Sequence, residues 1–224
     1  LVTSFTPYAV LSLISAAIAR IDYTAIKPLV SVLILTYVAS FVHSYLTTGA
    51  MLSIFSGLNP FKFFKKNFSV QAIGFTTQSS VGSIPANVDN LENNLGVSEN
   101  IASFVAPGGA TMGMPGCAGF WPVMTAILTA NVLGLDYTIT DYLGLILAAL
   151  LVSLGTVGVP GTATIATTAV FAAMGLPVEM VVILAPISSL ADMGRTATNV
   201  TAATSAALIV ASSEGELDRD KYNS

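Results

Sequence analysis

Apolar residues in this sequence gather in long runs, without the alternation of apolar and polar positions that marks a half-buried β-strand. Four runs stand out, at Leu29–Phe55, Ile101–Leu135, Leu143–Met174 and Val178–Ser212, and a shorter one covers Phe5–Ala19. A helix needs about 20 mostly apolar residues to cross a bilayer. The pattern therefore predicts an all-α integral membrane protein with several membrane segments.

Composition favours a membrane protein over a soluble helix bundle. Hydrophobic residues make up 54% of the 224 residues, the mean hydropathy is +0.78 and charged residues make up 9%, against about 25% in soluble domains. So few charges cannot cover the surface of a soluble fold, and we expect a multi-pass protein of the plasma membrane with lipid around it. The net charge of −4 comes without a basic patch, so no nucleic-acid partner is expected.

Residue types that carry most enzyme chemistry are scarce. Cys117 is the only cysteine and His43 the only histidine, which excludes an intrachain disulfide and a cysteine-based zinc site and leaves little for acid–base catalysis. We expect no transition metal, no cofactor and no enzymatic activity. The sequence starts at Leu1 without a basic region or a cleavage site, so we expect no signal peptide and a missing amino-terminal part.

Basic residues indicate an orientation, because Lys and Arg concentrate in cytoplasmic loops. Three lysines lie within residues 62–66, and the polar tail of residues 214–224 holds two more basic residues. Arg20 and Lys27 lie between the first two apolar runs. We expect the loop after the second run and the tail to be cytoplasmic, and Arg20 and Lys27 to lie outside.

Dense clusters of small residues interrupt two apolar segments. Residues 76–85 read TTQSSVGSIP and residues 155–162 read GTVGVPGT. Pro and Gly cost about 3 and 1 kcal/mol within a helix, and backbone freed at membrane depth survives only where protein or a water-filled cavity covers it. We therefore expect two re-entrant helical hairpins that enter from opposite faces, as an inverted repeat with a binding site between their tips. The alternative is a pair of kinked spanning helices.

A third interruption, at residues 108–119, is rich in glycine. Its unwound carbonyls could coordinate a cation, or its small residues could serve close helix packing. The expected segments are residues 1–58 as two transmembrane helices, 59–96 as hairpin 1, 97–135 as a partly unwound transmembrane helix, 136–177 as hairpin 2, 178–213 as the final transmembrane helix and 214–224 as the tail.

The segment Asp192–Asn199 carries the sharpest chemical signal. Asp192 and Arg195 lie in an apolar run, where a charge costs at least about 2.5 kcal/mol and indicates a functional site. Helical spacing puts both on one stripe with Thr196 and Asn199. The stripe could bind a small anionic or zwitterionic solute, with Arg195 on a carboxylate and Asp192 on an ammonium group. The alternative is an Asp–Arg pair that neutralises itself and holds two helices together.

Tandem hydroxyls mark the first interruption. Ser79 and Ser80, with backbone N–H groups at the start of a half-helix, suit an anionic group. A catalytic serine is the alternative, but it needs an adjacent base, and only His43 and Asp192 are candidates. Cys117 is interpreted as a packing residue or a wall of the site.

These features resemble the dicarboxylate/amino acid:cation symporter family, which includes the glutamate transporters. Besides the serine tip, the resemblance rests on Phe5-Thr6-Pro7-Tyr8, Gly57-Leu58-Asn59-Pro60, Leu95-Gly96-Val97-Ser98-Glu99, Gly158-Val159-Pro160-Gly161 and Asp192-Met193-Gly194-Arg195-Thr196. It implies scaffold helices before Leu1, a homotrimer, and a transport core that each protomer moves like an elevator. Hairpin 2 would act as the gate.

The resemblance also implies which residues form the site. Asp192 would bind the amine of the solute, Arg195 a distal carboxylate, and Thr196 with Asn199 the α-carboxylate. The implied solute contacts are Ser79, Ser80, Cys117, Val159, Gly161, Ala163, Asp192, Arg195, Thr196 and Asn199. The implied cation contacts are Gly109, Thr111, Met112, Ser153, Leu154, Thr156 and Asn199.

The sequence departs from the family pattern in the cation sites. Gly113–Cys117 replaces an Asn-Met-Asp-Gly-Thr stretch, and Ala203 stands where the family has an Asp, so coupling to Na⁺ or to H⁺ stays open. Gly116–Gly119 and Gly215–Asp218 resemble the bacterial L-cystine symporter branch. We expect a symporter for an amino acid or dicarboxylate, with L-cystine as the alternative solute. An anion-conducting channel and a substrate-sensing receptor are the alternatives from other classes.

Overall fold

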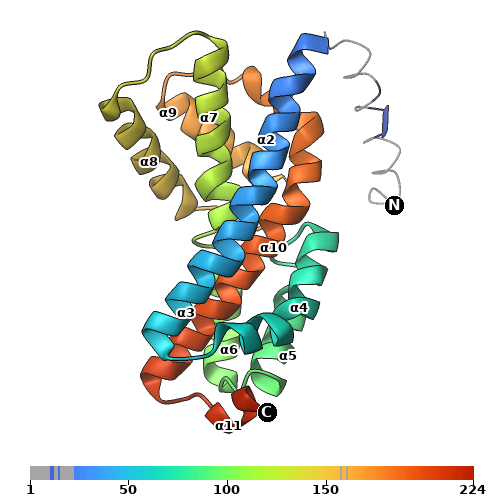
Figure 1. The fold of residues 1–224 in the computed structure, drawn as a ribbon, viewed down its shortest axis with the longest axis vertical. Coiled ribbons are helices and arrows are strands. Elements are labelled where there is room, and N and C mark those ends of the chain that lie inside the picture. Colours follow the sequence, from blue (N-terminus) through green and yellow to red (C-terminus); the bar gives the residue numbers. More distant parts are fainter. Residues whose placement is uncertain (1–10, 13–14, 16–22, 157, 160) are drawn as a thin grey trace.

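The computed structural model describes residues 23–156, 158–159 and 161–224, together with residues 11, 12 and 15. Two helical columns run side by side along the length of the molecule (Figure 1). One is α10 (Met180–Glu214), and the other is the continuous series α2 (Tyr23–Phe41), η1 (Val42–Thr47) and α3 (Thr48–Ser56). Both are long and apolar enough to cross a membrane. The first of the two transmembrane helices expected within residues 1–58 lies almost entirely outside the described residues.

Polar contacts join the two columns. The Tyr37 hydroxyl donates to the Leu190 carbonyl at 2.8 Å, and the Ser44 hydroxyl donates to Thr198 Oγ1 at 3.1 Å. Ser44 lies in η1, which is a short π-helical turn. Such turns shift the register of the side chains that follow and are frequent at functional sites.

The first helical pair, α4 (Pro60–Thr77) and α5 (Ile84–Asn93), occupies the lower half of the molecule (Figure 1). The Asn59 side chain caps α4 by accepting from the Phe61 N–H at 2.9 Å, and proline takes the first helical position. The helix ends at Gln78, whose φ of 54° is left-handed. The predicted interruption at residues 76–85 therefore ends one helix and starts the next.

The glycine-rich interruption is also present. Helix α6 (Glu99–Gly109) lies in the lower half and α7 (Trp121–Val132) in the upper half (Figure 1). Between them, residues 110–114 are non-helical and η2 (Pro115–Phe120) forms a second π-helical turn. This segment crosses the middle of the molecule beside α10.

The second helical pair, α8 (Ile139–Ser153) and α9 (Thr162–Ala173), lies in the upper half (Figure 1). A capping box at Thr138 and Asp141 starts α8. The two helices have 15 and 12 residues, which makes them about 22 and 18 Å long. Each is too short to cross a hydrocarbon core of about 30 Å.

The segment after α10 folds back onto the lower end of the molecule. Leu217 pairs with Val97 in an isolated antiparallel bridge, and a short helix, α11 (Arg219–Asn223), follows. Tyr222 is fully buried, and its hydroxyl donates to the Asn59 carbonyl at 2.8 Å. The tail, expected only to be polar and charged, thus inserts an aromatic side chain into the core.

Buried apolar side chains of the described residues form three clusters. One includes Phe63, Leu208 and Tyr222, and another includes Leu145 and Phe171. The third packs η2 and the start of α7 against α2, α9 and α10, and its buried members are Val32, Met114, Cys117, Trp121, Ala163 and Ala191. Two members of this third cluster, Cys117 and Trp121, contact Asp192 and Arg195 of α10.

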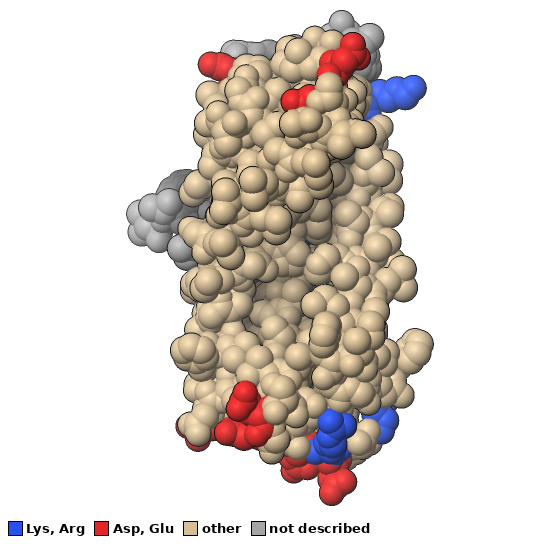
Figure 2. Space-filling view, turned by 90° about the vertical axis from the view of Figure 1, so that its left-hand side faces the viewer, with Lys and Arg blue, Asp and Glu red and all other residues tan. Residues whose placement is uncertain are grey.

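The outer surface is apolar over a broad belt. Large side chains of α8 are exposed, among them Ile139 at 80% and Leu151 at 62%. In the face shown in Figure 2, Lys, Arg, Asp and Glu gather at the two ends and leave the middle free of charge. Such a belt suits a hydrocarbon environment or other apolar helices.

Candidate functional site

The predicted polar stripe is buried near the middle of α10. Asp192, Arg195, Thr196 and Asn199 are at most 7% exposed. Arg195 Nη2 donates to Asp192 Oδ1 at 3.1 Å and to the Ser188 carbonyl at 2.7 Å. Because both charged residues belong to one helix, their ion pair by itself does not join α10 to another helix.

The rest of the Arg195 guanidinium group has an unusual environment. Its Cζ atom lies 4.1 Å from the centroid of the Trp121 ring. Its Nε and Nη1 atoms are buried and have no hydrogen-bond partner among the described residues. Unused donors on a buried cation are costly unless an acceptor reaches them. A carboxylate is suited to this role, because it forms charge-assisted hydrogen bonds with guanidinium.

Helix η2 lies directly against the polar stripe. Asn199 Oδ1 accepts from the Gly116 N–H at 2.7 Å, and Asn199 Nδ2 donates to Cys117 Sγ at 3.1 Å. Cys117 Sγ in turn lies 3.5 Å from Asp192 Oδ1. The close approach depends on glycine, since a Cβ at position 116 would lie 2.4 Å from the Arg195 carbonyl oxygen. Cys117, Asp192 and Asn199 thus form one hydrogen-bonded group.

The turns of the two helical pairs meet beside this group. The Val81 N–H donates to the Gly158 carbonyl at 3.1 Å, and the Gly158 N–H donates to the Ala110 carbonyl at 3.0 Å. A Cβ at Gly158 would lie 2.7 Å from Ser80 Cβ and 3.2 Å from Met114 Sδ. Three interruptions that are far apart in the sequence therefore share one contact point.

The remaining predicted solute contacts take different positions. Ser80 is buried at the contact point, and the Ser79 hydroxyl accepts from the Gly82 N–H at 3.0 Å. Ala163 is buried in the same cluster as Cys117. Val159, in contrast, is 43% exposed. Gly161 has a φ of 92° and precedes α9.

The predicted cation contacts fall into two groups. The Gly113 N–H donates to the Ser153 carbonyl at 3.2 Å, which places the segment of Thr111 and Met112 beside that of Ser153, Leu154 and Thr156. Gly109 lies at the α6–α10 contact, where a Cβ at Gly109 would lie 2.6 Å from Ala203 Cβ, whereas Asn199 of α10 bonds to Gly116 and Cys117 of η2. Among the described residues, no group of three or more His, Cys, Asp or Glu could hold a metal ion.

A separate groove lies on another side of α10. It has a volume of about 540 Å³ and opens between α2, η1, α4 and α10. Among the described residues, its lining includes Tyr37, Phe41, Tyr45, Phe68 and Phe75 but no charged side chain. The groove therefore lacks the charges that would recognise an ionic solute.

Comparison with known proteins decides the family. A sequence profile of the sodium:dicarboxylate symporter family matches residues 1–213. The chain belongs to this family. L-cystine uptake protein TcyP from Bacillus anthracis is 38% identical over 224 residues, that from Bacillus licheniformis 36% over 223 residues, and that from Shouchella clausii 32% over 224 residues. These alignments cover 99–100% of this chain but 48% of each relative, so the chain spans about half the length of the curated relatives it matches.

Membership of the sodium:dicarboxylate symporter family places the protein in a membrane. The names of the family and of the relatives describe transport or uptake, which is not an enzymatic activity. Two helical segments, Lys27–Ser56 and Met180–Glu214, are candidate spans among the described residues. The resemblance drawn from the sequence motifs is thereby confirmed.

Trp121 is a residue of the candidate site that the sequence motifs missed. It is buried, and the Arg195 guanidinium carbon lies over its ring. Its spacing from Cys117 is four residues, about one helical turn, which predicts a common face. Within a long apolar run, however, an aromatic residue is more often part of the core than of a site, so spacing alone did not single it out.

Proposed function

We propose that this chain is the transport core of a symporter that imports L-cystine. The observation that carries the proposal is the buried Arg195 guanidinium, with two unpartnered nitrogen atoms beside the Cys117–Asp192–Asn199 group. L-cystine has an ammonium–carboxylate group at each end. Asp192 would bind one ammonium group, and Arg195 the carboxylate at the far end. The names of the TcyP relatives, 32–38% identical, support this choice among amino acids and dicarboxylates.

The two helical pairs would act as re-entrant hairpins of an inverted repeat. In support, the two pairs lie in opposite halves of the molecule, and their turns meet at Gly158. The helices of the second pair, α8 and α9, are also short. The solute would bind next to this meeting point, and the α8–α9 pair would move to admit it. The part of the protein corresponding to the uncovered half of the relatives would supply the scaffold of a homotrimer, against which this core moves like an elevator.

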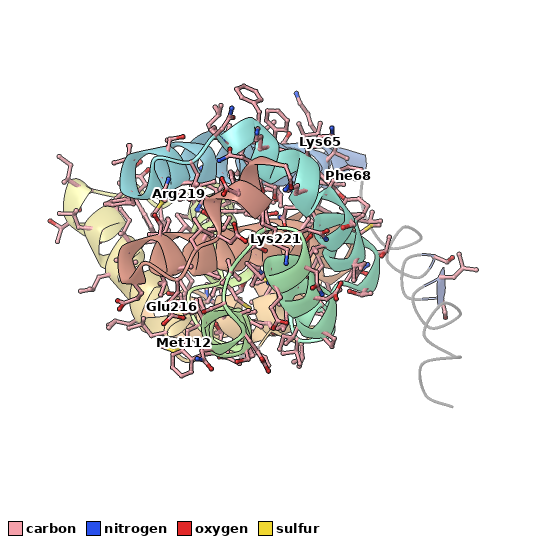
Figure 3. The ribbon with its side chains drawn as sticks, turned by 90° about the horizontal axis from the view of Figure 1, so that it is seen from below. Lys65, Phe68, Met112, Glu216, Arg219 and Lys221 are labelled. Carbon is pink, nitrogen blue, oxygen red and sulfur yellow. The ribbon has the colours of Figure 1, made fainter. Side chains whose placement is uncertain are left out.

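The basic residues of α4 and of the tail support an orientation. Lys66 of α4 donates to the Lys221 carbonyl of the tail at 2.7 Å, so these segments share one end of the molecule; Lys65, Arg219 and Lys221 are labelled in the view from below (Figure 3). Lys and Arg concentrate in cytoplasmic loops, so this end and the tail would face the cytoplasm.

A proton gradient is the coupling force that we propose. Both ends of the Asn199 amide already have protein partners. The methyl group of Ala203 lies against Gly109, where a cation would need oxygen ligands. This packing supports coupling to H⁺ over a Na⁺ site at the α6–α10 contact.

Uptake by the intact protein in proteoliposomes tests the function. Radiolabelled L-cystine, L-glutamate, L-aspartate and succinate would be compared under an imposed pH gradient, an imposed Na⁺ gradient and no gradient. We expect saturable accumulation of L-cystine under the pH gradient alone. Accumulation of another solute would refute the L-cystine proposal, and dependence on Na⁺ would refute the proton. Non-saturating flux would indicate a channel, and binding without uptake a receptor.

Arg195→Ala should abolish high-affinity binding of L-cystine, because the distal carboxylate loses the guanidinium that would bind it. We expect an increase in Kd of at least about a hundredfold by isothermal titration calorimetry. Arg195→Lys keeps the charge but not the planar fork, so it should bind with intermediate affinity. Undiminished binding by Arg195→Ala would remove Arg195 from the site.

A further inference from the structure

The aromatic contact on Arg195 has a consequence for solute choice. Trp121 begins α7, directly after the π-helical turn η2. Cys117, four residues earlier, contacts Asp192 and Asn199. One face of the η2–α7 junction therefore presents a thiol to Asp192 and Asn199 and an indole ring to the Arg195 guanidinium.

The guanidinium group is held at one end and by an aromatic ring. Nη2 is held by Ser188 and Asp192, and Cζ lies over the ring of Trp121, 4.1 Å from the ring centroid. Trp is the best aromatic partner for such a cation, and the attraction grows when water is absent. Trp121 and Arg195 are both 1% exposed, so water does not weaken the stacking.

The two unpartnered nitrogen atoms lie in the plane of the guanidinium group, whose rotation is limited by the bonds to Nη2 and by the contact with Trp121. Nε and Nη1 are edge donors, and a carboxylate meets guanidinium edge-on, in the same plane. A guanidinium free to rotate about its side-chain bonds could turn these donors to hydroxyl or carbonyl oxygens nearby. A fixed plane keeps them directed at one position.

We propose that Trp121 is a positioning residue that makes the site selective for solutes with a distal carboxylate. It does so through Arg195, by holding the guanidinium plane ready for that carboxylate before the solute arrives. This inference rests on the proposed function, because it needs a solute that reaches Arg195. It adds a specificity role to a residue that otherwise belongs to the central apolar cluster.

The test compares two ligands that differ in one carboxylate. L-cystine is the first, and the mixed disulfide of L-cysteine and cysteamine, which lacks one carboxylate, is the second. Their Kd values would be measured by isothermal titration calorimetry on the intact protein and on its Trp121→Leu and Trp121→Phe variants. Phe171→Leu is the matched control, since Phe171 is a fully buried aromatic residue of another cluster.

Trp121→Leu should raise the Kd for L-cystine about tenfold, which corresponds to about 1.4 kcal/mol. The Kd for the mixed disulfide should change by less than about twofold, because this ligand has no distal carboxylate that could bind to the positioned guanidinium. Trp121→Phe should restore part of the selectivity, since a phenyl ring keeps a weaker cation–π contact. Phe171→Leu should lower thermal stability and leave the ratio of the two Kd values unchanged.

Fluorescence gives a second, independent readout. Trp121 is the only tryptophan of the chain, so the emission difference between the wild-type protein and Trp121→Phe isolates its signal. We expect this difference spectrum to shift when L-cystine binds and to stay constant with the mixed disulfide.

An equal loss of affinity for both ligands in Trp121→Leu would reduce Trp121 to a packing residue and overturn the inference, as would unchanged affinity for both. A wild-type protein that binds neither ligand would instead overturn the proposed function, and this inference with it. The wild-type measurement thus separates the two failures.

Discussion

At the scale of single residues, the site depends on how closely two backbones approach. The π-helical turn η2 lies so near α10 that Gly116 leaves no space for a side chain. The Asn199 side chain uses this proximity to accept from the Gly116 N–H, and Cys117 contacts Asp192. Arg195 is therefore positioned by the packing of the η2 backbone against α10 as well as by its ion pair with Asp192.

Gly116→Ala should distort this contact. The new Cβ would lie 2.4 Å from the Arg195 carbonyl oxygen, and relieving such overpacking costs about 1–3 kcal/mol. We expect a lower thermal midpoint in detergent and weaker binding of L-cystine. Gly119→Ala is the matched control, because its Cβ would have its nearest neighbour at 4.0 Å. Equal behaviour of the two variants would contradict the importance of the close approach.

At the scale of elements, the two helical pairs are joined through backbone atoms at their turns. Gly158 accepts from Val81 and donates to Ala110. A few hydrogen bonds of this kind can break and re-form during each cycle, whereas an interlocked set of large side chains would resist separation. The contact therefore suits a gate that must open and close.

Gly158→Ala should impair closure of the proposed gate. A Cβ there would lie 2.4 Å from the Ala110 carbonyl oxygen and 2.7 Å from Ser80 Cβ. We expect initial uptake of L-cystine by proteoliposomes to fall about tenfold or more. Gly155→Ala should transport normally, since a Cβ at Gly155 meets no atom of the described residues within 4 Å. An unchanged initial rate for Gly158→Ala would argue against a gate at this turn.

At the scale of the whole molecule, residues 215–224 contact elements that are distant in sequence and connect them. Lys66 of α4 donates to the Lys221 carbonyl at 2.7 Å, and Arg219 donates to the Ser56 carbonyl at 3.0 Å. With the buried ring of Tyr222, these bonds tie the base of the first helical pair to α3. The contacts described for the tail therefore hold the α4–α5 pair, and we expect the α8–α9 pair to be the more mobile of the two.

The tail contact should weaken in alkali. Burial raises the pKa of the Tyr222 phenol to about 12, against the opposing effect of a Phe63 backbone hydrogen bond, whereas an exposed tyrosine ionises near pH 10. Between these values the unfolded state binds fewer protons than the folded state, so stability is present below pH 10 and falls as the pH rises towards 12. We expect a loss on the order of 2 kcal/mol, measured by thermal unfolding in detergent.

Tyr222→Phe is the control for this pH dependence. The variant keeps the buried ring but has no proton to lose, so the part of the decline that Tyr222 causes should be absent. It should also be less stable than the wild-type protein at neutral pH by about 1 kcal/mol, because the Asn59 carbonyl loses the hydrogen bond from the Tyr222 hydroxyl. Identical dependence of thermal stability on pH in the two proteins would show that ionisation of the Tyr222 phenol does not destabilise the tail contact.

The sequence by itself determined the features that depend on neighbouring residues. Apolar runs predicted the long helices, because burying a helix in lipid needs about 20 apolar residues whatever lies beside it. Gly, Pro and Ser clusters predicted where helices end, as at Thr77 and Ser153, because these residues act on the local backbone. Helical spacing likewise predicted the stripe of Asp192, Arg195 and Asn199.

Only the tertiary structure decided which distant segments meet. Nothing local in the sequence brings Gly158 to Val81 and Ala110, Trp121 to the face of Arg195, or Tyr222 to Asn59. These contacts follow from how whole helices pack, which depends on the combined shape of many side chains and on where each turn directs the chain. Local propensity fixed the elements and the chemistry that they carry, and packing fixed which of those residues face one another.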